Sequence, residues 1–130
     1  MTDKKNILEE LYADVGAFDP QRIVDCLKPF LNIQRGGHAI FFTKEGHALK
    51  NEDKMLAYFL VKKLLNSQGV IEEAGISAKE VHEQTELPKG TVDPGMQKLK
   101  KDGLLIGSGS NYEIPNRRVD AIIERLEKYK

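Results

Sequence analysis

The stretch 77–115, SAKEVHEQTELPKGTVDPGMQKLKKDGLLIGSGSNYEIP, decides the fold class of this 130-residue chain. Ser77, with Glu80 three residues later, forms a capping box that predicts the start of a short helix. A turn and a second helix follow, and Gly103 stands where a helix end takes the left-handed conformation. Residues 104–115 predict two short strands around a tip of Gly and Ser. The expected order is therefore helix, turn, helix and hairpin.

The second helix of this stretch has an apolar face and a polar face. Val92, Met96 and Leu99 recur at helical spacing, which predicts that they pack on the core. The opposite face carries donors long enough to reach base edges or phosphates. Residues 87–101 contain four lysines and one aspartate, and such a local excess of positive charge releases counterions when it contacts phosphate. The polar face is therefore a candidate nucleic-acid surface.

The start of this helix is open to two interpretations, because Pro94 and Gly95 stand early in it. Proline is well tolerated only in the first turn of a helix, and glycine weakens a helix by about 1 kcal/mol relative to alanine. The helix could begin near Lys89, with Pro94 in its interior. It could instead begin late, with Asp93 as its cap and Pro94 at its first position.

The pattern Leu99-Lys-Lys-Asp-Gly103-Leu-Leu105, preceded by Gly90-Thr91-Val92 and followed by a Gly-tipped hairpin, resembles the winged helix-turn-helix superfamily. The resemblance covers about residues 51–115, with 51–65 as the first helix. It implies an α+β fold in which the last helix of the motif enters the major groove and the hairpin, or wing, lies near phosphates. The residues that it would bring to DNA are Thr91 and Gln97 as groove readers, Lys89, Lys98 and Lys101 as phosphate contacts, and Ser108, Ser110 and Asn111 at the wing.

The expected organisation has three parts: residues 1–50 as an N-terminal helical annex with a β-hairpin, 51–115 as the winged helix-turn-helix domain, and 116–130 as a C-terminal helix. Asn51 is a plausible cap for the first helix of the domain, and the acidic residues Glu52 and Asp53 suit the positive end of a helix. Apolar residues then follow over a wide arc, which predicts a central helix packed on more than one side.

The annex has signals for two helices and a hairpin. Apolar residues at helical spacing predict a first helix over residues 7–15. The pair Asp19-Pro20 predicts the start of a second helix, which should end near Lys28. Residues 38–42 and 47–49 predict two strands joined by a glycine-containing turn.

The last segment predicts a helix capped by Asn116, with apolar residues at Val119, Ile122, Ile123, Leu126 and Tyr129. The resemblance implies a homodimer seam along this stripe, and the alternative is that the helix folds back on its own core. Arg117 and Arg118 stand at the start of the helix, where cations oppose the helix dipole. They could contact an external anion, such as a phosphate beside the wing, or they could simply be solvated.

The composition limits the function classes. Twenty basic and twenty acidic side chains cancel, so a nucleic-acid surface would have to be a local patch. The lysines at 98, 100 and 101 could equally be a solvated helix end that complements the helix dipole. No apolar run approaches the length of a membrane span, and the charged N-terminus lacks a secretory core, so we expect a cytoplasmic protein without membrane contact.

Signals for catalysis, cofactors and metals are weak. The sequence has no nucleophile elbow, phosphate loop or HExxH motif, so we expect no enzyme and no cofactor. His38, His47, His82 and Cys26 lack the short spacing of zinc ligands, and Cys26 is expected as a small buried group. Residues 40–42 could line an apolar ligand pocket, but ordinary core is the expectation.

Two functions remain open. The first is a DNA-binding protein, a transcriptional regulator that binds double-stranded DNA as a dimer. The alternative is a winged-helix module that contacts a protein partner in a larger assembly and does not bind DNA. Neutral overall charge, a wing without Lys or Arg and five glutamates within residues 68–86 favour that alternative.

Overall fold

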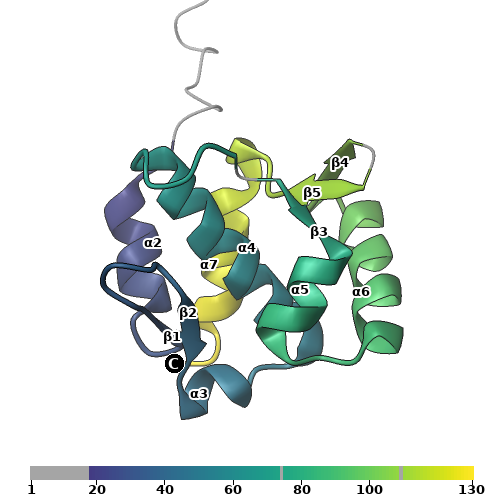
Figure 1. Ribbon diagram of the computed structural model, residues 1–130, viewed down its shortest axis with the longest axis horizontal. Helices are drawn as coiled ribbons and strands as arrows, with labels where there is room; N and C mark the ends of the chain where they lie inside the picture. Colours follow the sequence, from purple (N-terminus) through teal and green to yellow (C-terminus); the bar gives the residue numbers. More distant parts are fainter. Residues whose placement is uncertain (1–17, 74, 109) are drawn as a thin grey trace, which may run out of the picture.

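Helix α4 (Asn51–Ser67) forms the centre of the computed structural model, and the other elements pack around it (Figure 1). The structure describes residues 18–73, 75–108 and 110–130, so the helix predicted for residues 7–15 lies outside it. Side chains on all sides of α4 are buried, because helices pack against it on several sides. The wide apolar arc is thereby confirmed. Lys50 takes the cap position expected for Asn51, so the helix begins one residue earlier than predicted.

Helix α2 (Pro20–Leu27) packs on α4 and begins as predicted. The Asp19 carboxylate accepts a hydrogen bond from the Gln21 N–H at 2.9 Å, and a proline occupies the first helical position. The helix ends with Lys28 at its cap, which confirms the predicted end.

Helix α7 (Val119–Glu127) folds back on the same core, against α2 and α4. Its apolar stripe is buried within the chain: Val119, Ile122, Ile123 and Leu126. The homodimer seam predicted along this stripe is therefore wrong for these four residues, because α2 and α4 already cover them. A 3-10 turn, η1 (Asn116–Arg118), precedes α7, so the α-helix begins after the predicted cap at Asn116.

The hairpin predicted for the annex is right in its first strand and wrong in its second. Strand β2 (Ile40–Phe42) lies within the predicted strand, but it pairs antiparallel with β1 (Leu31–Ile33), which precedes it in the chain. The loop between the two strands turns where Gly36 takes a left-handed conformation, with φ of +88°. Residues 47–49 therefore have no place in this sheet.

Helix α3 (Lys44–His47) forms where the second strand was expected. The Thr43 side chain caps α3 by accepting a hydrogen bond from the Gly46 N–H at 3.1 Å. A Cβ at Gly46 would lie 1.9 Å from the Phe30 carbonyl oxygen. This glycine thus marks a close approach of two backbone segments and not the turn of a hairpin.

A second antiparallel sheet has the strand order β3-β5-β4. Strands β4 (Ile106–Ser108) and β5 (Asn111–Glu113) form the hairpin predicted around the Gly/Ser tip. Strand β3 (Ile76–Ser77) was not predicted, because two residues carry no periodic pattern. Its pairing, with Ile76 opposite Tyr112, places it on the other side of β5.

Helices α5 (Ala78–Thr85) and α6 (Lys89–Lys101) pack on each other and on α4. The Ser77 hydroxyl accepts a hydrogen bond from the Glu80 N–H at 3.2 Å, which confirms the predicted start of α5. Beyond the end of α6, Gly103 has φ of +80°, the left-handed conformation that was predicted.

The start of α6 settles the choice between the two interpretations. The helix begins at Lys89, so the late start at Pro94 is wrong and this proline lies inside the helix. The Pro88 carbonyl accepts hydrogen bonds from the N–H groups of residues 91–92, which closes the first turn before Pro94 is reached. A proline at this place removes only the one helical hydrogen bond to the Gly90 carbonyl.

Candidate nucleic-acid interface

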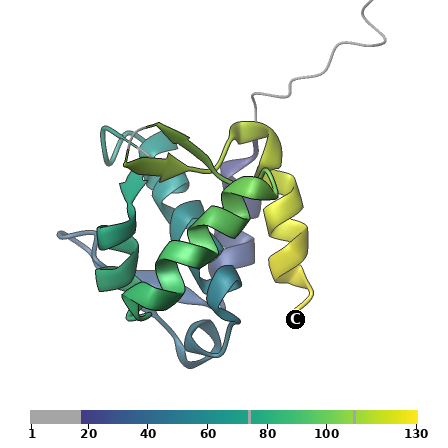
Figure 2. The ribbon, with the colours of Figure 1, turned by 90° about the vertical axis from the view of Figure 1, so that its right-hand side faces the viewer.

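The outward face of α6 and the β4–β5 hairpin lie side by side on one face of the molecule (Figure 2). Apolar residues of α6 are buried on the inner face, as predicted: Val92, Met96 and Leu99. Thr91 is half-buried near the start of the helix. The other predicted site residues of α6 are exposed: Lys89, Gln97, Lys98 and Lys101.

The exposed residues of α6 divide into two flanks. At about 100° per residue, Lys89 and Lys100 lie on one flank, Lys98 lies on the other, and Gln97 and Lys101 lie between them. The flank of Lys100 faces Tyr112 of β5, and we name it the hairpin flank. The flank of Lys98 faces the start of α4, and we name it the α4 flank. The lysines of α6 therefore do not share one direction.

On the hairpin flank, α6 contacts the side chain of Tyr112. Gln97 Nε2 donates a hydrogen bond to Tyr112 Oη at 3.2 Å, and Lys100 Nζ lies 5.8 Å from the centroid of the Tyr112 ring. A Cβ at Gly107 would lie 2.9 Å from Tyr112 Cε1, so the glycine leaves room for the ring over β4. Sequence reasoning missed Tyr112, because its role depends on the register of the hairpin.

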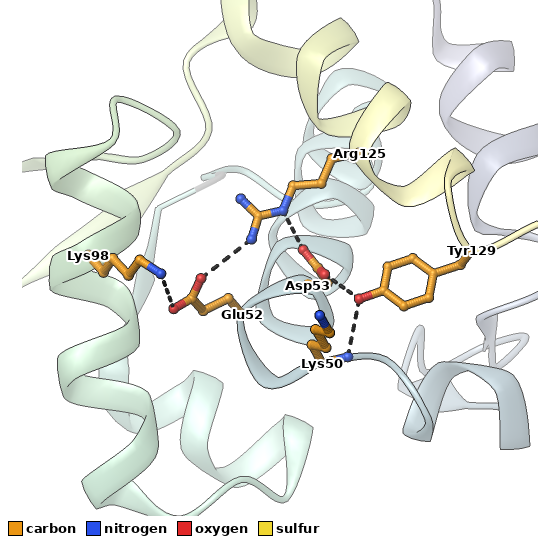
Figure 3. Close-up of polar contacts among 6 residues, drawn as sticks. All are labelled: Lys50, Glu52, Asp53, Lys98, Arg125 and Tyr129. Carbon is orange, nitrogen blue, oxygen red and sulfur yellow. Dashed lines mark hydrogen bonds and ion pairs between the residues drawn. The ribbon is translucent and has the colours of Figure 1, made fainter.

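On the α4 flank, Lys98 belongs to a network of polar contacts (Figure 3). Lys98 Nζ lies 3.3 Å from Glu52 Oε1, and Arg125 Nη2 lies 3.4 Å from Glu52 Oε2. Arg125 Nε donates a hydrogen bond to Asp53 Oδ1 at 2.5 Å. The network thus joins α6, the first turn of α4 and α7. The side chain of Lys98 is 62% exposed, yet a carboxylate of the same chain balances its charge.

Asp53 is the buried centre of this network, with 6% of the residue exposed. The Tyr129 hydroxyl donates a hydrogen bond to the second carboxylate oxygen of Asp53, and the Lys50 N–H donates to that hydroxyl at 3.4 Å. Tyr129 is 40% exposed, and its partial burial and its bond to Asp53 together raise the pKa of its hydroxyl. Sequence reasoning placed Asp53 only at the positive end of a helix, because no local pattern connects it to α7.

A hollow of about 630 Å³ opens between α5, α6 and β5. Two predicted site residues from different elements, Lys89 and Ser110, line it together with Tyr112. The other ionisable residues along its wall are of both signs: Lys79, His82, Glu83 and Asp93. The hollow therefore extends the face formed by α6 and the hairpin, but its charges largely balance.

The tip of the hairpin carries hydroxyl and amide groups. Ser108 belongs to β4, and Ser110 and Asn111 are exposed where the chain returns into β5. The hairpin strands and their tip contain no Lys or Arg. This part of the candidate site can therefore offer an anion only uncharged donors.

Arg117 and Arg118 are exposed in η1, and Arg118 lies beside the turn that follows α6. A Cβ at Gly103 would lie 3.5 Å from Arg118 Nη2, so the guanidinium of Arg118 covers the turn that follows α6. Helix carbonyls form the negative end of the helix dipole there. The position of Arg118 thus has an explanation within the chain, without an external anion.

A second hollow, of about 540 Å³, lies between the β1–β2 loop and helices α4 and α5. The Tyr58 hydroxyl donates a hydrogen bond to Glu80 Oε2 at 2.7 Å, and Lys62 Nζ lies 3.3 Å from the same oxygen. Burial and the contact with Glu80 raise the pKa of Tyr58. Ile40 lines this hollow among mainly polar residues, and Phe41 points outward with 56% of the residue exposed. The polar lining of this hollow and the outward position of Phe41 therefore do not support an apolar ligand pocket at residues 40–42.

Cys26 is fully buried, as predicted, and burial raises the pKa of its thiol to about 11. Within residues 18–73, 75–108 and 110–130, no group of three or more His, Cys, Asp or Glu side chains is placed to hold a metal ion. In the same part of the chain, every helix is too short or too polar to cross a bilayer. Comparisons with protein-family models, curated proteins and solved structures found no match for this chain.

Proposed function

We propose that this chain is a DNA-binding protein with a winged helix-turn-helix domain, and that it acts as a transcriptional regulator. The order of elements supports this domain, because α4 is followed by β3, then by α5 and α6, and then by the β4–β5 hairpin. In the sheet, β5 lies between β3 and β4. Such an arrangement presents one helix and one hairpin on the same face, as a helix that enters a groove beside a wing requires.

The exposed polar face of α6 next to the hairpin is the observation that carries the proposal. Lys89, Lys100 and Lys101 are exposed on it, and ammonium groups release counterions when they contact phosphate. Gln97 lies among them and offers both a donor and an acceptor to base edges. In this mechanism α6 lies in the major groove, and the uncharged donors of the hairpin tip lie near flanking phosphates.

Lys98 has a smaller part in this mechanism than the sequence predicts. Its ammonium lies 3.3 Å from a carboxylate oxygen of Glu52, so a phosphate must compete with that carboxylate. Lys89 and Lys101 are the main phosphate contacts in the proposal, because they flank Gln97 along the exposed face.

Binding of a generic DNA duplex, measured at increasing salt, tests the proposal. The double variant Lys89→Ala/Lys101→Ala should bind more weakly, and its plot of log K against log salt should be less steep by about 2. The matched control is Lys28→Ala/Lys128→Ala, which removes the same charge from exposed positions after α2 and α7. Helix α2 lies on the side of α4 away from α6 (Figure 1), and the C-terminal end of α7 lies at the opposite end of the molecule from the hairpin (Figure 2).

Two results would contradict the proposal. One is no binding of duplex DNA at low salt. The other is an equal change of slope in both double variants, which would show that only the net charge matters. Circular dichroism of each variant should show that it is folded, so that a loss of binding is not caused by unfolding.

A second candidate function is a protein-interaction module, and one surface favours it. Glu72, Glu73 and Glu113 line a hollow of about 360 Å³ together with Ile106. Ile106 lies on the edge strand β4 and is 44% exposed. An exposed apolar side chain within an acidic rim suits contact with a basic protein surface.

Capture of a protein partner at physiological salt tests this second candidate, because high salt would screen the contact of its acidic rim with a basic surface. Ile106→Asp should abolish the capture, because it places a charge at the centre of the surface. Phe41→Asp is the matched control, since Phe41 is exposed on the separate β1–β2 sheet. Equal capture by both variants would remove the candidate.

A further inference from the structure

We infer that Tyr112 positions the carboxamide of Gln97 so that Gln97 selects adenine at one position of a bound duplex. The inference rests on the proposed DNA-binding function. It adds the base that is recognised and the residue that orients the recognising group. Tyr112 acts through Gln97 in this scheme and makes no contact with the base itself.

The contact that supports the inference joins α6 to the middle strand of the second sheet. Gln97 is exposed on α6, and its Nε2 donates a hydrogen bond to Tyr112 Oη at 3.2 Å. A free glutamine side chain samples many rotamers, and fixing it on binding has an entropic cost. The bond to Tyr112 removes part of that freedom before any ligand arrives, which is preorganisation.

The bond leaves the rest of the carboxamide available. A glutamine amide has two N–H donors and one carbonyl acceptor, and Tyr112 uses one donor. The remaining N–H and the Oε1 of Gln97 match the N7 acceptor and N6 donor that adenine presents in the major groove. Guanine presents two acceptors there, thymine an acceptor and a methyl group, and cytosine a donor, so none of them offers this pair. An oriented carboxamide at this place therefore favours adenine.

Tyr112 is itself held in place by its neighbours. Its strand pairs on both sides, with Tyr112 opposite Ile76 of β3 and opposite Gly107 of β4. The ring lies over Gly107, and Lys100 Nζ lies 5.8 Å from the ring centroid. The hydroxyl that receives Gln97 thus belongs to a side chain fixed by the sheet and by α6 together.

Selection of bound duplexes from a random library by the full chain tests the inference. The unaltered protein should enrich adenine at one position, with about tenfold or greater preference over the other bases. Tyr112→Phe keeps the ring over Gly107 and removes only the hydroxyl. This variant should lose most of the preference for adenine. Its affinity for a random duplex should stay within about twofold of that of the unaltered protein, and the slope of log K against log salt should not change.

Substitutions of Gln97 separate recognition from folding. Gln97→Glu should shift the preference toward cytosine, because a carboxylate accepts from the cytosine N4 amine. Gln97→Met keeps the length of the side chain at an exposed position and should abolish any preference there. Gln97→Met remains a valid test even if Tyr112→Phe disturbs the hairpin. Gln97 is exposed, so its replacement should not prevent α6 from folding.

The outcomes distinguish the inference from the proposed function. If DNA is bound and the enriched bases are the same in Tyr112→Phe and Gln97→Met as in the unaltered protein, the inference is overturned and the DNA-binding function stands. If no duplex is bound at low salt, both are overturned. If Gln97→Met loses the preference and Tyr112→Phe keeps it, Gln97 recognises the base without help, and the positioning role is overturned.

Discussion

The two flanks of α6 differ in what they contact. On the α4 flank, Lys98 belongs to a network of charges of both signs that reaches the buried carboxylate of Asp53. On the hairpin flank, the contacts to Tyr112 are a neutral hydrogen bond and a cation above a ring. Exposure alone therefore does not identify a cation that is available to a ligand, because Lys98 is exposed and already has a partner.

The difference also separates stability from binding. An exposed ion pair such as Lys98 with Glu52 contributes only about 0–1 kcal/mol to the free energy of unfolding. A buried carboxylate that bonds to two side chains contributes far more when it is removed, because its partners lose their bonds. We therefore expect Asp53 to matter for folding, and the residues nearer the surface to matter for binding.

The largest expected effect is that of Asp53→Ala. The change leaves Arg125 and the Tyr129 hydroxyl without their shared acceptor and removes a negative charge from the first turn of α4. The free energy of unfolding should fall by about 2–4 kcal/mol, measured by equilibrium urea denaturation. Asp25→Ala removes an exposed carboxylate of α2 and should change stability by less than about 1 kcal/mol. Similar losses in the two variants would contradict the central place of Asp53.

Glu52→Gln should change DNA binding and leave stability nearly unaltered. The amide no longer balances Lys98, so a phosphate meets a free ammonium on the α4 flank, while Arg125 keeps its bond to Asp53. We expect duplex affinity at low salt to rise about 3- to 10-fold, and the salt dependence to steepen by about 1 in the log-log plot. Glu45→Gln on α3 makes the same change of charge elsewhere. An equal gain in both variants would show that Glu52 has no specific role.

The smallest expected effect concerns stability at alkaline pH. The pKa of Tyr129 is raised in the folded chain, so its stabilising contribution is complete below the unfolded value of about 10. As the pH rises further, the unfolded chain loses the proton first and stability falls. Tyr129→Phe should remove this part of the decline, measured as urea midpoints at several pH values above about 9.

Other groups act in the same pH range, so the comparison must be made between variants. The raised pKa of Tyr58 also makes stability fall as the pH rises. The lowered pKa values of Lys54 and Lys63 make stability rise with pH, which opposes this decline. Tyr112→Phe is the matched control on the hairpin flank. If Tyr129→Phe and the unaltered chain decline in parallel, the bond of Tyr129 to Asp53 does not contribute.

Local signals predicted some helix ends, although the caps expected at Asn51 and Asn116 were wrong. Asp19 and Ser77 cap their helices, and Gly103 follows the end of α6. Each of these hydrogen bonds or conformations involves residues only a few positions apart, so the information lies in a short stretch of chain. The apolar spacing of α6 predicted its buried side for the same reason.

Pairings between distant segments could not be predicted in the same way. Residues 47–49 were assigned to a strand, but β2 pairs with β1, and β3 was missed altogether. Strands of two or three residues carry almost no periodic pattern, and packing around them selects their partners. The candidate site shows the same limit, because Tyr112 and Glu52 are recognisable only from what they contact.

The sequence by itself determined the α+β composition of the fold, the succession of helix, turn, helix and hairpin, and the side of α6 that faces the core. Only the tertiary structure decided which polar groups of α6 are already in use. Lys98 meets Glu52 because α4 and α6 pack together, and Gln97 meets Tyr112 because β5 lies beside α6. The physical reason is that charges and hydrogen bonds act through distances in space, and these distances exist only after the core has brought remote segments together.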